Sequence, residues 1–195
     1  MSQIFTNFKL LLTKTSLVVG SALLLTIFLP QSNALTMAVE LSNGQTAFEG
    51  SLRLINTYAN FTKRGNSLAK YYFTLEISED AGEPLKAIKI EQRKYFADIV
   101  EFKTEESSAF IGDRFARGEK LSLATVETNA ELGEGEVTVI FEQPVSPGNT
   151  VTVVVKPKRN PRTGGVYLFG LTAYPEGEDS LGKYLGSGRL HISHR

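Results

Sequence analysis

The sequence contains no cysteine, which removes every possibility that depends on a thiol. Without it there is no disulfide to restrain the unfolded chain, no cysteine nucleophile and no cysteine for a lipoprotein anchor. The chain also lacks a G-x-S-x-G segment for a serine nucleophile. Stability must therefore come from packing alone, and no catalytic residue is indicated.

Histidine is scarce, and its placement argues against metal binding. The two histidines, His191 and His194, lie within the last five residues, where chain ends usually fray. An offset of three residues puts their side chains on opposite faces of a strand, so they cannot share a metal. Gly133-x-Gly135 and Gly186-x-Gly188 lack the third glycine and the helix of a dinucleotide site. Neither a metal nor a cofactor is expected.

The N-terminus has the pattern of a Sec-type signal peptide. Lys9 and Lys14 precede an uncharged apolar run over residues 16–29, and Pro30 and Ser32-Asn33-Ala34 follow. This run is shorter than the ~20 residues of a membrane-spanning helix, and no other segment approaches that length. We expect cleavage after Ala34, with export to the periplasm or the extracellular space. An uncleaved N-terminal anchor is the alternative.

Residues 35–195 are expected to form a single domain, since their number suits one hydrophobic core. Removal of the signal peptide takes away two lysines and no acid, which leaves 19 basic against 21 acidic side chains, a net charge of −2. A nucleic-acid partner would require a basic excess. Nucleic acid is therefore not an expected partner.

The stretch Thr150–Tyr174 carries the strongest strand signals. Residues 150–156 and 166–174 are apolar on both faces, as strands in the middle of a core are. Turn dipeptides lie between them, and we expect the two strands to pair as a central hairpin. Val153 and Phe169 are predicted to be core residues.

The remaining segments add short strands separated by turns. We expect a first strand over Ser51–Phe61 with an irregularity near Ile55-Asn56, and a short helical turn within Thr104–Phe115. Tyr71–Ile77 and Leu85–Gln92 are predicted to form a hairpin-like pair. A further hairpin is predicted from Leu121–Thr128 and Gly135–Glu142, around the turn Asn129–Glu134. The last predicted strand is Gly188–Ile192. This pattern predicts an all-β fold, an antiparallel β-sandwich of the immunoglobulin-like type, with a closed barrel as the alternative.

Several short segments of the sequence resemble those of a known family. They are Tyr71–Leu75, Ala81–Leu85, Ile90–Arg93, Arg159–Gly170 and Tyr184–Arg189. Together they resemble the cyanobacterial exported proteins grouped as domain of unknown function 2808, over about residues 50–192. The resemblance implies a cyanobacterial source and export, and it carries no catalytic residue over.

The loop Pro157–Gly165 is the candidate ligand-binding segment. It holds Lys158, Arg159, Asn160 and Arg162 between two rigid strands, and arginine can hold a carboxylate or phosphate through two parallel hydrogen bonds. The structural alternative is that Arg159 or Arg162 pairs with an acid such as Glu176 or Glu178, or holds loop carbonyls.

The functional prediction is a non-enzymatic binding or structural module of the cell envelope. Its expected partner is an envelope protein or an anionic polysaccharide. The alternative is a hydrolase that acts on envelope glycan or peptide through a carboxylate pair, which no motif places. The acidic turn with Glu79, Asp80 and Glu83 has oxygen ligands suited to Ca²⁺, but we favour a solvated turn.

Overall fold

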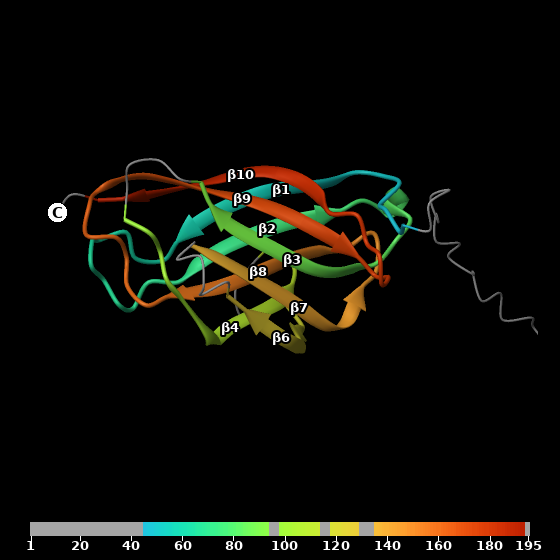
Figure 1. Ribbon diagram of the computed structural model, residues 1–195, viewed down its shortest axis with the longest axis horizontal. Coiled ribbons are helices and arrows are strands. Elements are labelled where there is room, and N and C mark those ends of the chain that lie inside the picture. The colour runs from blue at the N-terminus through green and yellow to red at the C-terminus, as the bar shows by residue number, and fades with distance from the viewer. Residues whose placement is uncertain (1–44, 94–97, 114–117, 129–134, 194–195) are drawn as a thin grey trace, which may run out of the picture. The chain divides into compact units, whose positions relative to one another are not determined.

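The computed structural model describes residues 45–93, 98–113, 118–128 and 135–193 (Figure 1). Three predictions lie outside these residues: the signal peptide of residues 1–34, the turn Asn129–Glu134 and the position of His194. No helix within the described ranges has the length and apolarity to span a membrane.

The described strands form two antiparallel five-stranded sheets. Sheet 1 has the order β1 (Leu52–Ala59), β2 (Tyr71–Ile77), β8 (Thr150–Pro157), β4 (Phe102–Ile111) and β5 (Lys120–Leu121). Sheet 2 has the order β10 (Lys183–Ile192), β9 (Gly165–Pro175), β3 (Leu85–Gln92), β7 (Glu136–Val145) and β6 (Leu123–Glu127). A short 3-10 helix, η1 (Glu79–Ala81), follows β2. The predicted β-sandwich is confirmed, and the alternative of one closed barrel is wrong.

The core lies between the sheets because alternate residues of each strand point inward. Phe169 of β9 and Val153 of β8 are both fully buried, as predicted. The Phe169 ring packs against aromatic rings from sheet 1, with centroid distances of 5.7 Å to Tyr71, 5.9 Å to Phe73 and 6.2 Å to Phe102. These tilted and edge contacts are favoured for aromatic pairs and join the two sheets.

The predicted central hairpin is wrong, although both of its strands exist. Strand β8 lies between β2 and β4 in sheet 1, whereas β9 lies between β10 and β3 in sheet 2. Each strand is central because it carries apolar side chains, but they face one another across the core instead of sharing a ladder. The turn residues between them carry the chain from one sheet to the other.

The predicted pair Tyr71–Ile77 and Leu85–Gln92 is wrong for the same reason, since β2 belongs to sheet 1 and β3 to sheet 2. In contrast, β6 and β7 do pair antiparallel, as predicted. The irregularity near Ile55-Asn56 is also confirmed, because the register of β1 with β2 shifts between Leu54 and Asn56.

Two further predictions need correction. The segment expected to contain a helical turn, Thr104–Phe115, is largely the strand β4, whose register with β8 shifts between Lys103 and Ser108. The extra residues of β4 at this register shift interrupt the alternation of apolar and polar side chains from which a strand is predicted. The last strand begins at Lys183 and not at Gly188, because glycines that disfavour a helix are tolerated at a bulge.

Candidate binding site

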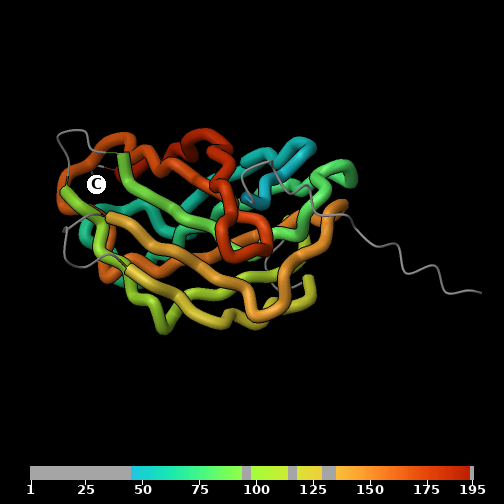
Figure 2. Tube along the Cα trace, turned by 45° about the vertical axis from the view of Figure 1, so that its right-hand side comes forward, coloured from blue at the N-terminus to red at the C-terminus, as the bar shows by residue number. Residues whose placement is uncertain are grey.

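The candidate loop lies at one end of the sandwich, beside the loop that connects β1 and β2. Figures 1 and 2 both show these two connections at the same end. The Gly65 amide donates to the Pro161 carbonyl at 3.0 Å, and the Lys158 amide donates to the Glu101 carbonyl at 2.7 Å. We call residues 60–70, 98–101 and 158–164 the basic end.

Asn160 is fully buried and anchors the basic end. Its Oδ1 accepts a hydrogen bond from the Tyr71 hydroxyl at 2.9 Å, and its Nδ2 donates to the carbonyls of Phe61 and Lys63, both at 2.9 Å. Its backbone amide donates to the Asn66 carbonyl at 2.8 Å. Both amide hydrogens of the side chain are therefore used within the protein, as buried polar groups require. The structure places this predicted ligand residue in the interior.

Asp98 holds the second half of the loop. Its Oδ2 accepts hydrogen bonds from the amides of Arg162 at 2.8 Å and Thr163 at 3.1 Å. Its own carbonyl accepts from Gln92 Nε2 at 2.9 Å, which ties this segment to the end of β3. The Tyr167 hydroxyl donates to the Thr163 carbonyl at 2.8 Å. The loop backbone is thus held from both sides before any ligand arrives.

Lys158 is engaged in an exposed ion pair. Its Nζ lies 2.6 Å from Glu101 Oε2, and both side chains are more than half exposed. The hydrogen bond from Lys158 lowers the pKa of the Glu101 carboxyl, and the charges of Lys158 and Arg159 act in the same direction. Exposed pairs of this kind stabilise a fold by at most about 1 kcal/mol. A ligand can therefore compete for Lys158 at little cost.

Arg159 and Arg162 are the two arginines that the β8–β9 loop contributes to the basic end. Both are exposed, and within the described ranges neither guanidinium has a side-chain hydrogen bond or ion pair. They border a hollow of about 540 Å³ together with Asp98, Ile99, Glu101 and Lys158. The acids proposed as structural partners, Glu176 and Glu178, follow the opposite end of β9, roughly 35 Å away for an 11-residue strand. That pairing is wrong.

The carboxyl groups of this hollow do not form a hydrolytic pair. Asp98 is occupied by two backbone amides, and Glu101 by Lys158. The pKa of Glu101 is lowered, which is the wrong direction for a general acid. In the part of the chain that the structure describes, no group of three potential metal ligands is found. Both carboxylates of this hollow therefore serve contacts within the protein.

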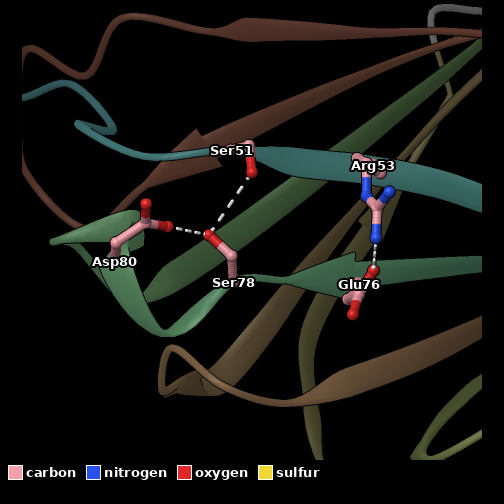
Figure 3. Close-up of polar contacts among 5 residues, drawn as sticks. All are labelled: Ser51, Arg53, Glu76, Ser78 and Asp80. Carbon is pink, nitrogen blue, oxygen red and sulfur yellow. Dashed lines mark hydrogen bonds and ion pairs between the residues drawn. The ribbon is translucent and has the colours of Figure 1, made fainter.

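The opposite end of the sandwich carries the acidic turn around η1. Figure 3 shows that Asp80 accepts a hydrogen bond from Ser78, and that Arg53 of β1 pairs with Glu76 of β2. The Arg53 and Glu76 side chains lie 2.5 Å apart at their closest atoms. Glu79 and Asp80 are exposed, whereas Glu83 is buried. The three acids proposed for Ca²⁺ therefore differ in environment and do not converge.

Two residues that shape the basic end, Tyr71 and Asp98, have no functional signal in the sequence. Tyr71 fits the apolar face of a strand, which explains it without its hydroxyl. Asp98 lies between the predicted strand Leu85–Gln92 and the segment Thr104–Phe115, and belongs to no motif. The dipeptide Asn160-Pro161 is a signal that the chain turns there, but not that the asparagine is buried.

The sequence profile of the family described as "Protein of unknown function (DUF2808)" matches residues 45–192. No curated protein sequence matches the chain.

Solved structures are similar to this chain at low sequence identity. The collagen-binding domain of a Staphylococcus aureus adhesin is 8% identical, with a TM-score of 0.35 over 70% of this chain and 97% of that one. The collagen-binding subdomain of the Enterococcus faecalis surface protein ACE is 9% identical, with a TM-score of 0.39 over 73% and 99%. The C-terminal domain of Streptococcus pyogenes AspA is 15% identical, with a TM-score of 0.39 over 78% of this chain and 44% of that one. Similarities this distant carry no inference about function.

Proposed function

The chain belongs to the DUF2808 family of proteins of unknown function, and from its own geometry we propose that it is a non-enzymatic module that binds an anionic polysaccharide of the cell envelope. The proposed ligand contacts are Lys158, Arg159 and Arg162. Asn160 holds the loop that carries them in place through its buried hydrogen bonds. An acidic envelope protein is the alternative partner.

One observation carries this proposal. The loop is held by the hydrogen bonds of the buried Asn160 and of the Asp98 carboxylate, while its two arginine side chains have no hydrogen bond or ion pair among the described residues. A loop that is already ordered loses little entropy on binding. Guanidinium groups on such a loop recognise carboxylates, sulfates or phosphates through paired hydrogen bonds.

The proposal includes export. The N-terminal pattern described above supports a signal peptide over residues 1–34, with residues 35–195 as one domain in the periplasm or the extracellular space. Mass spectrometry of the protein from its native source should find Leu35 as the first residue. An intact Met1 in the membrane fraction would instead assign the protein to an anchored class.

Binding is tested by affinity electrophoresis through gels containing polygalacturonate, with neutral dextran as the control polymer. The double variant Arg159→Ala/Arg162→Ala should lose retardation by polygalacturonate without a change in melting temperature. The variant Arg53→Ala/Lys86→Ala removes the same charge elsewhere and should still be retarded. If the arginine variant is destabilised while its retardation is unchanged, the loop is structural and the proposal fails.

A further inference from the structure

A second hollow lies on the outer face of sheet 2, where β3, β9 and β10 run side by side (Figure 1). Its volume is about 580 Å³, and its lining includes Arg93, Val166, Leu168, Ser187 and Arg189. None of its lining residues belongs to the hollow of the basic end. It is therefore a separate feature of the surface.

A β-bulge in β10 arranges the polar side chains of this hollow. Tyr184 pairs with Thr172 of β9, but Gly186 already pairs with Leu171, so Leu185 is the extra residue. Residues three apart normally face opposite sides of a strand, and the bulge brings Tyr184 and Ser187 to the same side. Their hydroxyl oxygens lie 2.8 Å apart. Gly186 has a φ of 105°, which favours glycine at the bulge.

Gly170 of β9 has no side chain and so leaves room for the side chains of Arg93 and Tyr184. A Cβ placed there would lie 3.1 Å from Arg93 Nε and 3.2 Å from Tyr184 Cε2. Because this space is open, the Arg93 guanidinium lies over the Tyr184 ring, with 5.0 Å between Cζ and the ring centroid. The contact orients the arginine. The hydrogen bonds of the Tyr184 hydroxyl with the side chains of Arg93 and Ser187 lower the pKa of that hydroxyl.

Two arginines flank one apolar residue across the three strands. Arg189 of β10 is the register partner of Leu168, and on the other side the Arg93 amide donates to the Leu168 carbonyl at 2.8 Å. Val166 adds a half-exposed apolar surface beside them. The acid nearest in register, Glu91, lies opposite Gly170 and is within 3.8 Å of Lys89. No partner for the Arg189 guanidinium is found in the described ranges.

We propose that Arg93, Ser187 and Arg189 form a second binding site for an anionic sugar unit, whose apolar face rests on Leu168 and Val166. The two guanidinium groups would hold the carboxylate or sulfate, and Ser187 would contact a ring hydroxyl. A shallow apolar floor with a polar rim suits a sugar ring. The backbone groups of β9 are already paired on both sides, so a peptide cannot add to the sheet at this position. This site goes beyond the proposed function because it uses a different surface.

The test measures binding of a galacturonate trimer, a sulfated trisaccharide and neutral maltotriose to the full chain by calorimetry. Wild type should bind one of the two anionic sugars, and Arg189→Ala should weaken that binding by roughly 10-fold or more. Arg189→Lys, which retains the charge but not the paired geometry, should give an intermediate loss. Since Arg189 is exposed, the melting temperature of both Arg189 variants should equal that of wild type.

The loop variant Arg159→Ala/Arg162→Ala separates this site from the basic end. It should retain the part of the short-sugar binding that Arg189→Ala removes, and lose only the part that the basic end contributes. Unchanged affinity in Arg189→Ala, or no binding of either anionic sugar by wild type, would overturn the second site. Loss of all short-sugar binding in the loop variant while Arg189 is intact would also overturn it, because the basic end would then account for the binding.

Discussion

The two ends of the sandwich hold their loops in different ways. At the basic end, the buried side chain of Asn160 joins the β8–β9 loop to the β1–β2 loop. At the opposite end, the loops are joined by backbone hydrogen bonds, such as Glu49 to Ala81 at 3.0 Å and Leu181 to Thr46 at 2.8 Å, with exposed side-chain contacts around them. Backbone hydrogen bonds also join the loops of the basic end, but there the buried Asn160 side chain adds stability that depends on one residue.

The largest expected effect is that of Asn160→Ala. This change leaves the Tyr71 hydroxyl and the carbonyls of Phe61 and Lys63 without their partner, and buried unsatisfied groups are costly. We expect a loss of roughly 3–5 kcal/mol in the free energy of unfolding, measured by urea denaturation. The matched change at the other end, Asn149→Ala, removes one exposed bond to the Ser146 carbonyl and should cost less than about 1 kcal/mol. Equal losses would end the contrast between the two ends.

Gly50→Ala tests the backbone fit of the opposite end. A Cβ at Gly50 would lie 2.2 Å from the Asp80 carbonyl oxygen, so the two loops would have to separate. We expect a loss of about 1–3 kcal/mol, seen as a lower melting temperature. The neighbouring change Ser51→Ala should have almost no effect, because Ser51 is exposed. A stable Gly50→Ala variant would show that these loops adapt easily.

Tyr71→Phe should cost about 1–2 kcal/mol at neutral pH, because the aromatic ring remains and only the bond to Asn160 is lost. A double variant with Asn160→Ala should lose less than the sum of the single changes. Burial raises the pKa of the Tyr71 hydroxyl above its ordinary value of 10.0. The folded protein therefore favours the neutral Tyr71 hydroxyl. Its contribution to the free energy of unfolding is present below pH 10 and is lost as the pH rises above 10, since Tyr71 of the unfolded chain ionises first. Denaturation from pH 8 to 11 should therefore show the advantage of wild type shrinking; a constant difference would contradict this.

The smallest effects are expected for the exposed ion pairs of the two ends. Glu101→Gln and Glu76→Gln should each cost at most about 1 kcal/mol, and less in 1 M salt. Lys158 lowers the pKa of Glu101, so this contribution is present above the ordinary value of 4.5 and is lost as the pH falls below it. Melting curves between pH 3 and 7 should converge for wild type and Glu101→Gln at the acidic limit. A gap that persists there would assign Glu101 a role other than this pair.

The candidate site was only partly predictable. Arg159 and Arg162 stand out in the sequence because cations cluster between two strands, and the structure leaves both exposed. Asn160 belongs to the same cluster, yet it is buried. Its partners Tyr71, Phe61 and Lys63 are about 90 to 100 positions away in the chain. Local patterns carry no information about such distant contacts.

The sequence by itself determined most strand segments, with β4 and the start of β10 as the exceptions, and it identified residues that face the core. Alternation with a period of two is a local property, so Val153 and Phe169 could be placed in the core before any pairing was known. Membership of an all-β class follows from the same pattern. The bulge near Ile55-Asn56 was also visible, because it interrupts that alternation.

Only the tertiary structure decided which strands pair. Backbone ladders use the same amide and carbonyl groups in every strand, so β8 has no local preference for β9 over β2 and β4. Burying β8 and β9 on facing sheets brings Val153 and Val155 from one sheet and Phe169 from the other into one core. The same crossing brings the basic loop against residues 60–70 and 98–101, and so creates the surface on which Arg159 and Arg162 stand.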